Sequence, residues 1–310
     1  MSEIFDIICD NLDELRLDEY SVAKRRILEL SDLAEHTAKE LLKYLDDGLS
    51  VYDGLSLIHD SLRFENVAAS DEDSLEVLSS LALPTDAFDK ILFSSLLLKS
   101  LEKNGKRVSE SDFLKSAPSA ESFTYVRNAF SDEAYDVFSL DFTDPRVRYS
   151  QNLKECERLL LDGVVDYCIL PLEERGGVRL HSTTELVFRN DFKINSVTSV
   201  FGFDSSQDLK YALISKHFTI PHLAPDTDRY LELRLSQDKS DSLFSLLYAI
   251  RRLGLTVYRI NTLTFDIEGA QSSYFSVVVR DEGKEYTPLF TYLGLFEDEC
   301  DAVGVYKNLE

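Results

Sequence analysis

The sequence predicts a mixture of α+β and α/β structure, in which a helical N-terminal region precedes two regions that contain both helices and strands. Three observations lead to this prediction. Apolar residues recur at steps of three and four in residues 1–115, strand-like and helix-like runs alternate over residues 117–222, and residues 228–310 follow the order βαββαβ. We therefore expect three domains with these boundaries.

The N-terminal region shows the periodicity of amphipathic helices. One stripe stops before the Asp46–Gly48 cluster, and its members are Ile27, Leu30, Ala34, Ala38, Leu41 and Leu45. A second helix is expected over about residues 85–103, with Thr85 as its N-cap and Asn104–Gly105 at its end. No catalytic motif stands out in this region.

Residues 117–222 alternate between strands and helices. Short apolar or alternating runs predict strands at residues 147–149, 164–170 and 194–201, and an apolar pattern predicts a helix at residues 152–162. Alternation of this kind favours parallel pairing of strands. A linker at residues 221–226 is expected to follow.

The last region follows the order strand, helix, strand, strand, helix, strand. The predicted elements are, in chain order, residues 230–235, 243–250, 256–260, 274–279, 285–296 and 302–306. This order is the ferredoxin-like arrangement, in which two helices cover one face of a sheet. The other face would then be open to a partner or a ligand.

The composition excludes several classes of protein. With 44% hydrophobic and 29% charged residues among 310, the chain is neither disordered nor fibrous, and no apolar run is long enough to cross a membrane. A formal net charge of -23 disfavours binding to nucleic acid and to anionic lipid. The acidic start, Met1–Asp6, lacks the basic segment of a signal peptide, so we expect a cytoplasmic protein.

The cysteines and histidines predict no metal site. The cysteines, Cys9, Cys156, Cys168 and Cys300, form no CxxC pair, and the histidines show no ligand spacing. Cys156 and Cys168 stand in apolar patterns and are expected to be buried. We expect neither a metal nor another cofactor.

The segment Asp166–Glu174, Asp-Tyr-Cys-Ile-Leu-Pro-Leu-Glu-Glu, resembles the prephenate dehydratase family, which typically has Asp-Tyr-Gly-Val-Val-Pro-Ile-Glu-Asn at the end of a strand. Further segments look like the family's Gly-Ser-Phe-Ser segment, a helix and an Asp-Leu-Lys-Ile strand, and they are Glu121–Thr124, Thr184–Val187 and Asp191–Ile194. The tail is similar to the ACT regulatory domain of that family, through Gly254–Ile260 and Val303–Tyr306. The resemblance covers about residues 118–310.

The resemblance implies a dehydratase-like lobe followed by an ACT-like domain, and it also shows departures. The family's domain has two lobes, whereas residues 117–222 match only the first. The family's Thr-Arg-Phe motif, whose Thr is central to catalysis, corresponds here to Leu209-Lys210-Tyr211, and a Leu cannot donate a proton. Glu174 also stands in place of the family's Asn.

Dehydration of prephenate, a dianion, needs cations that hold two carboxylates and a donor that protonates the departing hydroxyl. The candidate catalytic residues are Ser122, Thr124, Glu173, Arg175 and Lys210, with Arg179 as a further cation. Simpler roles stay open. Ser122 and Thr124 are also interpretable as helix caps, Glu173 as a structural residue, and Arg175 and Arg179 as exposed loop charges.

The ACT resemblance implies a second set of candidates. Such domains bind amino acids where backbone N–H groups at a helix start meet the ligand carboxylate, and the corresponding ligand-binding residues here are Asp241, Ser242, Leu243, Asn261 and Thr262. Asp241 takes the place of a Gly and adds negative charge, which disfavours phenylalanine. Binding of another amino acid, or dimerisation through edge-to-edge pairing of sheets, stays open.

The sequence thus favours a degenerate prephenate dehydratase-like protein linked to phenylalanine metabolism, a non-catalytic ligand-binding or regulatory homodimer for a small aromatic acid or amino acid. One alternative is an active prephenate dehydratase, which forms phenylpyruvate, with a second lobe rebuilt from residues 1–115. Another is a helical interaction scaffold, which exposed Phe and Leu on residues 85–103 would favour. No nucleic-acid or membrane partner is expected.

Overall fold

The structure is a computed structural model, and it describes residues 17–64, 84, 86–114, 121–174, 177–201, 208–218, 229–237, 240–267, 270–297 and 300–309. Helices prevail up to Lys103, and helices mix with strands from Ser122 onward, so the predicted fold class is confirmed. The chain divides into two compact units. Unit 1 comprises residues 1–108 and 290–296, and unit 2 comprises residues 109–289 and 297–310. The predicted domain boundaries lie outside the described residues, so the three-domain division stays a prediction.

Unit 1 is built from helices. They are α2 (Leu17–Asp46), α3 (Val51–Phe64), α5 (Ala87–Lys103) and the last turns of α10 (Thr287–Phe296). The predicted stripe of α2 is buried at Leu30, Ala34, Ala38 and Leu41. Burial of this stripe is what stabilises a long helix in water.

The start of α5 lies one residue later than the sequence predicts. Asp86, not Thr85, is the N-cap, because its carboxylate accepts a hydrogen bond from the backbone N–H of Asp89 at 2.8 Å. Asp89 is in turn paired with Arg26 of α2, with 2.5 Å between Oδ2 and Nη2. Ile91 and Leu97 are buried, whereas Phe88 is exposed.

This burial bears on two of the alternative functions. The apolar face of α5 packs inside unit 1. Exposed Phe and Leu residues on this helix would favour a helical scaffold, but of these residues only Phe88 is exposed. The described part of residues 1–115 contributes no strand, and a second α/β lobe would need strands.

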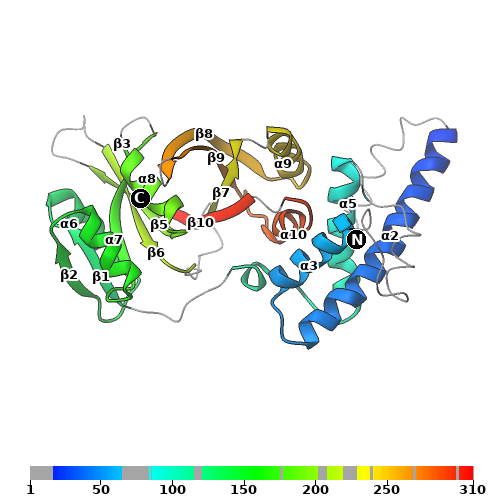
Figure 1. The fold of residues 1–310 in the computed structure, drawn as a ribbon, viewed down its shortest axis with the longest axis horizontal. Helices are drawn as coiled ribbons and strands as arrows, with labels where there is room; N and C mark the ends of the chain where they lie inside the picture. Colours follow the sequence, from blue (N-terminus) through cyan, green and yellow to red (C-terminus); the bar gives the residue numbers. More distant parts are fainter. Residues whose placement is uncertain are drawn as a thin grey trace. The chain divides into compact units, whose positions relative to one another are not determined.

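Unit 2 is organised around one mixed sheet (Figure 1). Its strands are β1 (Ser122–Val126), β2 (Arg146–Ser150), β3 (Tyr167–Glu174), β4 (Val178–Arg179), β5 (Lys193–Phe201), β6 (Asp208–Ser215), β7 (Arg229–Ser236), β8 (Thr256–Ile267), β9 (Ala270–Arg280) and β10 (Cys300–Leu309). Its helices are η1 (Glu110–Asp112), α6 (Ala129–Ser139), α7 (Leu153–Leu161), α8 (His181–Arg189), α9 (Ser240–Arg252) and the start of α10. The strand order is β2-β1-β3-β6-β5-β10-β7-β9-β8, with β4 beside β3.

The prediction of parallel pairing is met only in part. The strands predicted at residues 147–149, 164–170 and 194–201 lie in β2, β3 and β5 and do not pair with one another, and β6 is antiparallel to both β3 and β5. β1 is parallel to β2 and to β3, with α6 and α7 in the connections. β10 is parallel to β5, so the strands of residues 122–215 and of residues 229–309 form a single sheet. Gly304 permits this close approach, because a Cβ there would lie 2.8 Å from the Cβ of Ile194 on β5.

The tail has the predicted βαββαβ order, and its strands are antiparallel in the order β10-β7-β9-β8. Glu232, Val278 and Arg259 are register partners on three neighbouring strands, so their side chains share one face. The expectation of an open sheet face is met only in part on this face, because α8 packs over part of it. The rings of Phe188 on α8 and Phe265 on β8 lie 5.6 Å apart.

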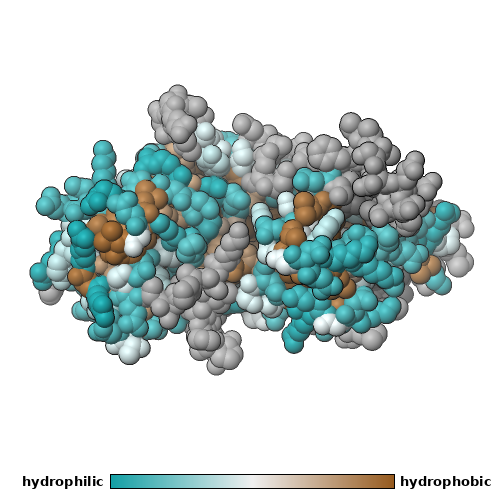
Figure 2. All heavy atoms as spheres, turned by 60° about the horizontal axis from the view of Figure 1, so that its bottom comes forward, coloured by the Kyte–Doolittle hydropathy of each residue, from teal (hydrophilic) through white to brown (hydrophobic). Residues whose placement is uncertain are grey.

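The buried apolar residues of unit 2 include two clusters. One surrounds Phe123 and Phe138, and the other contains Cys156 and Cys168, which are buried as the sequence predicts. On the face drawn in Figure 2, hydrophilic residues prevail and hydrophobic residues gather in small patches. None of the described helices has the length and apolar character needed to span a bilayer.

Candidate functional site

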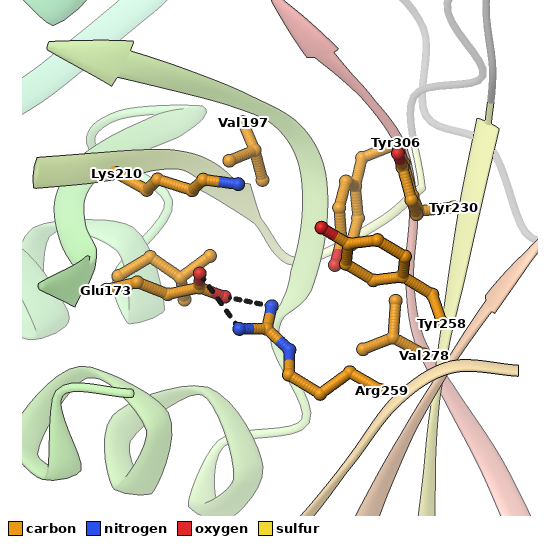
Figure 3. A pocket seen from close by; sticks show the side chains of 9 residues that line it. Glu173, Val197, Lys210, Tyr230, Tyr258, Arg259, Val278 and Tyr306 are labelled. Carbon is orange, nitrogen blue, oxygen red and sulfur yellow. Dashed lines mark hydrogen bonds and ion pairs between the residues drawn. The ribbon is translucent and has the colours of Figure 1, made fainter. Parts of the chain in front are cut away.

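A hollow lies on the face of the sheet that bears Arg259 (Figure 3). It is lined by side chains from seven consecutive strands of the sheet order, which are Leu172, Glu173, Lys210, Val197, Tyr306, Tyr230, Val278, Tyr258 and Arg259. The space enclosed among these side chains is small, about 20 Å³, and the hollow opens to solvent. A hollow that crosses so many strands requires the sheet to curve, and the curvature brings β3 close to β8.

A two-pronged ion pair joins these two strands. Arg259 of β8 donates from Nη2 to Oε1 of Glu173 at 2.5 Å and from Nη1 to Oε2 at 3.1 Å. Nη1 also donates to the backbone oxygen of Gly177 at 3.0 Å. The Glu173 side chain is 3% exposed and that of Arg259 is 22% exposed. Two parallel N–H···O bonds with little solvent around them form a strong and directional contact.

Arg179 of β4 is a second guanidinium in the same cluster. Its Nε lies 3.2 Å from Oε1 of Glu173, and its Nη2 lies 2.5 Å from Oε2 of Glu232. Burial acts to lower the pKa of Arg179, but the Glu232 carboxylate and its neighbours outweigh burial, so the pKa is raised above its ordinary value. Arg179 is therefore charged, and its charge is neutralised by two carboxylates.

Glu232 is fully buried and fully hydrogen-bonded. Besides Arg179, it accepts a hydrogen bond from Oγ of Ser276 at 2.8 Å and from the hydroxyl of Tyr306 at 3.2 Å. Burial, followed by the negative charge of Glu232, raises the pKa of Tyr306 above its ordinary value. The cluster of Glu173, Arg179, Glu232 and Arg259 thus satisfies its own charges inside the sheet, as buried charges require.

Irregular strand pairing aims these side chains into the hollow. The register shifts at Tyr258 in β8 and at Leu172 in β3, so each strand has one extra residue there. A β-bulge redirects neighbouring side chains and is common next to functional sites. The bulges explain why Tyr258 and Arg259, which are consecutive, both line the hollow, as do Leu172 and Glu173.

Lys210 of β6 is the cation that the cluster does not neutralise. It is the register partner of Glu173, and Figure 3 shows its side chain pointing into the hollow toward Tyr258. Among the described residues, no carboxylate forms an ion pair with its ammonium, because Glu173 and Glu232 are paired with the two arginines. Those four charges cancel, so Lys210 gives the site one surplus positive charge.

Three buried guanidinium nitrogens of the cluster also have no hydrogen-bond acceptor within the described part of the chain. They are Nε of Arg259, which lines the hollow, and Nε and Nη1 of Arg179, which is not among the lining residues. Buried donors without an acceptor are rare in folded proteins and call for an explanation, such as an acceptor on a ligand. Nε of Arg259 and the ammonium of Lys210 therefore give the hollow two donors for an anion with acceptor oxygens.

The structure brings together three of the predicted site residues, namely Glu173, Lys210 and Arg179. The interpretation of Arg179 as an exposed loop charge is wrong, because its side chain is 3% exposed and belongs to β4. Arg175 lies outside the described residues. The structural interpretation of Glu173 agrees with its ion pairs to both arginines.

Ser122 and Thr124 do not line the hollow. Both lie in β1 and cap no helix, so the capping interpretation is wrong. The Ser122 hydroxyl donates to the carboxylate of Asp166, and Thr124, which is fully buried, lies 2.6 Å from the Ser150 hydroxyl, measured between the two Oγ atoms. Hydroxyls engaged in this way stabilise the start of the sheet.

The candidates in the tail are spread over two elements. Asp241, Ser242 and Leu243 are at the start of α9, whereas Asn261 and Thr262 are in the middle of β8. Asn261 faces the same side as Arg259 and Thr262 faces the opposite side, because successive strand residues alternate. In the described structure no hydrogen bond joins the two groups, and their role in ligand binding stays a prediction.

Sequence reasoning missed Glu232, Arg259 and the tyrosines Tyr230, Tyr258 and Tyr306. The run from Tyr230 to Leu235 alternates polar with apolar residues, a pattern that indicates a solvent-exposed polar face. No local pattern shows that α8 and β4 cover that face. Among the described residues, no three His, Cys, Asp or Glu side chains form a metal-binding group.

Comparisons with known proteins give no family assignment. No family model and no curated protein matches the chain. Similar solved structures include prephenate dehydratase from Streptococcus mutans (14% identity, TM-score 0.49, covering 61% of this chain and 100% of that one). They also include prephenate dehydratase from Arthrobacter aurescens in complex with L-Phe (12% identity, TM-score 0.46, 60% and 89%) and GqqA, described as a quorum quenching acylase (16% identity, TM-score 0.44, 60% and 94%). The function proposed below therefore depends on the residues of this chain.

Proposed function

We propose that the chain is a non-catalytic relative of the prephenate dehydratases, a ligand-binding or regulatory protein for a small aromatic acid or an amino acid. The relation is supported by the resemblance at Asp166–Glu174 and by the order of similar segments up to Tyr306. The ligand-binding role is supported by the hollow, in which a cation and ring side chains face a common space.

The absence of catalysis is supported by one observation above all. Both arginines of the cluster are already neutralised, Arg259 by Glu173 and Arg179 by Glu173 and Glu232. Holding the two carboxylates of prephenate would need at least two cations, and breaking a buried ion pair to release one costs several kcal/mol, roughly 3–5. Lys210 alone can hold one carboxylate.

The catalytic threonine that the resemblance implies also has no counterpart in the lining. Leu209 stands where the resemblance implies the family's catalytic Thr, and the hydroxyls of Ser122 and Thr124 bond to Asp166 and Ser150, away from the hollow. The tyrosines of the lining remain, but Tyr306 donates to Glu232. Binding without dehydration is the activity that this arrangement favours.

Turnover of prephenate by the purified full chain tests the proposal. Phenylpyruvate formation is expected to equal the rate in buffer alone at every protein concentration. A rate that rises in proportion to protein concentration, and that Arg175→Ala or Lys210→Met abolishes, would show an active dehydratase. Lys154→Met, an exposed lysine of α7, is the matched control for loss of one positive charge.

Dimerisation is the second part of the proposal. β8 ends the strand order, so its outer edge pairs with no other strand among the described residues. It is 12 residues long, and Ile260 on it is exposed. Long strand edges with apolar side chains pair readily with another strand, and a second copy of β8 would close this edge.

A further inference from the structure

The hollow has a charge that distinguishes between classes of ligand. We infer that it binds a compact monocarboxylate, with the carboxylate between Lys210 and Arg259 and an apolar body against Tyr258 and Tyr230. This inference depends on the proposed ligand-binding function and narrows the ligand to one charge class.

The charges around the hollow favour a monoanion as the ligand. The two buried carboxylates and two guanidiniums cancel, and Lys210 adds one positive charge. A monoanion would make the site neutral. A dianion would leave one negative charge next to Glu173, and the ammonium of an amino acid would find no unpaired carboxylate in the lining. In a chain of net charge -23, an uncompensated cation in a hollow is the feature that attracts an anion.

The hydrogen-bond donors of the hollow favour a carboxylate. The Lys210 ammonium points into the hollow, and Nε of Arg259 is buried without an acceptor among the described residues. A carboxylate offers two acceptor oxygens, so it can accept from both groups at once. A neutral amide of the same shape has one carbonyl oxygen and would forfeit the charge-assisted bond to Lys210.

The apolar half of the hollow favours a ligand with an apolar body. Val197, Val278 and Leu172 line it together with two tyrosine rings. The rings of Tyr230 and Tyr258 lie 5.1 Å apart at an angle of 66°, an edge-to-face pair, and the half-exposed Tyr258 ring lies at the open side of the hollow. A flat apolar body would lie against these rings, since polar groups are few in this half.

The test measures binding to the full chain by ligand-observed NMR and by titration calorimetry, with benzoate as the probe. Benzamide, phthalate and phenylalanine serve as the neutral, dianionic and zwitterionic comparisons. Lys210→Met removes the surplus charge, Lys210→Arg keeps it, and Lys154→Met is the control at an exposed lysine. Circular dichroism of each variant verifies that it folds.

Benzoate is expected to bind more tightly than the three comparison compounds. Lys210→Met should weaken benzoate binding at least about tenfold, as expected for loss of one charge-assisted hydrogen bond, whereas Lys210→Arg and Lys154→Met should change it less than about threefold. Binding should also weaken as salt is added.

Three results would overturn the inference. They are no benzoate binding at about 10 mM, equal binding by Lys210→Met, and Lys210-dependent binding of inorganic phosphate in preference to benzoate. If phenylalanine binds and prephenate is not converted, the proposed function stands although this inference fails. If prephenate is converted, the proposed function itself fails.

Discussion

Glu173 on β3 and Arg259 on β8 form a two-pronged ion pair, although five strands separate β3 from β8 in the sheet order. The pair closes the curve of the sheet and bounds the hollow on one side. It joins the strands of residues 122–215 to those of residues 229–309 at a second place, in addition to the β5–β10 pairing. Because both groups are largely shielded from solvent, the pair is sensitive to loss of either partner.

Removing the Glu173 carboxylate should destabilise unit 2. Glu173→Gln leaves Arg259 without its carboxylate and Arg179 with one instead of two, so the free energy of unfolding should fall by about 3 kcal/mol. Urea unfolding followed by tyrosine fluorescence measures this, since the chain has 15 tyrosines and no tryptophan. Glu174→Gln, at the exposed end of the same strand, should stay within about 0.5 kcal/mol of the unsubstituted chain. Equal effects of the two substitutions would refute the role of the pair.

Gly304 should tolerate no larger residue. In Gly304→Ala the new methyl group would lie 2.8 Å from the Cβ of Ile194 and 2.9 Å from its backbone oxygen, so β10 must move away from β5. Overpacking of this kind costs about 1–3 kcal/mol. Hydrogen exchange should show faster exchange of amides in β5 and β10 in the variant. Unchanged protection of these strands would mean that β5 and β10 are not tightly packed against each other at Gly304.

Stability should fall at alkaline pH, in part through Tyr306. Burial, and then Glu232, raises the pKa of its hydroxyl in the folded chain, so this contribution is complete below the unfolded-state pKa of about 10 and is lost as pH rises above it. Above pH 10 the unfolded chain releases this proton while the folded chain keeps it, which lowers stability by about 1.4 kcal/mol per pH unit.

The variant Tyr306→Phe isolates this effect. It also loses a hydrogen bond, so the comparison concerns slopes of unfolding free energy against pH and not absolute stability. The two proteins should give parallel curves up to about pH 9 and diverge above pH 10, where the variant falls less steeply. Parallel curves over the whole range would contradict the burial of this hydroxyl.

The proposed dimer should depend on the edge of β8. Ile260→Lys places a charge on this edge, and charged edge residues oppose strand pairing. Sedimentation velocity should then show a dimer for the unsubstituted chain and a monomer for the variant. Leu140→Lys, an exposed position that follows α6, should leave the dimer intact. A monomeric unsubstituted chain at about 100 μM would exclude this part of the proposal.

Local periodicity predicted most helices and strands. The helix predicted at residues 152–162 is α7, and the βαββαβ order of the tail is found as expected. β8 is longer than its predicted range because Asn261, Thr262 and Thr264 interrupt the apolar pattern after Ile260. The β5–β10 pairing could not be predicted, since it joins strands far apart in the chain.

The site was predicted in part for the same reason. The sequence pointed to Glu173 and Lys210 because each belongs to a segment compared with a family motif, Asp166–Glu174 and Leu209–Tyr211. The structure places the two residues side by side on neighbouring strands. Glu232 and Arg259 look like ordinary polar residues of alternating strands. Their burial depends on β4 and α8, which cover the sheet face through contacts between distant segments.

One NMR experiment tests the central claim, which is that this chain binds small carboxylates without converting prephenate. Prephenate is added to the purified full chain, and its proton resonances are followed over time beside a sample without protein. We predict that phenylpyruvate appears only at the rate of the protein-free sample, and that the prephenate resonances broaden less than those of benzoate added at the same concentration. Phenylpyruvate that accumulates in proportion to the amount of protein would contradict the account.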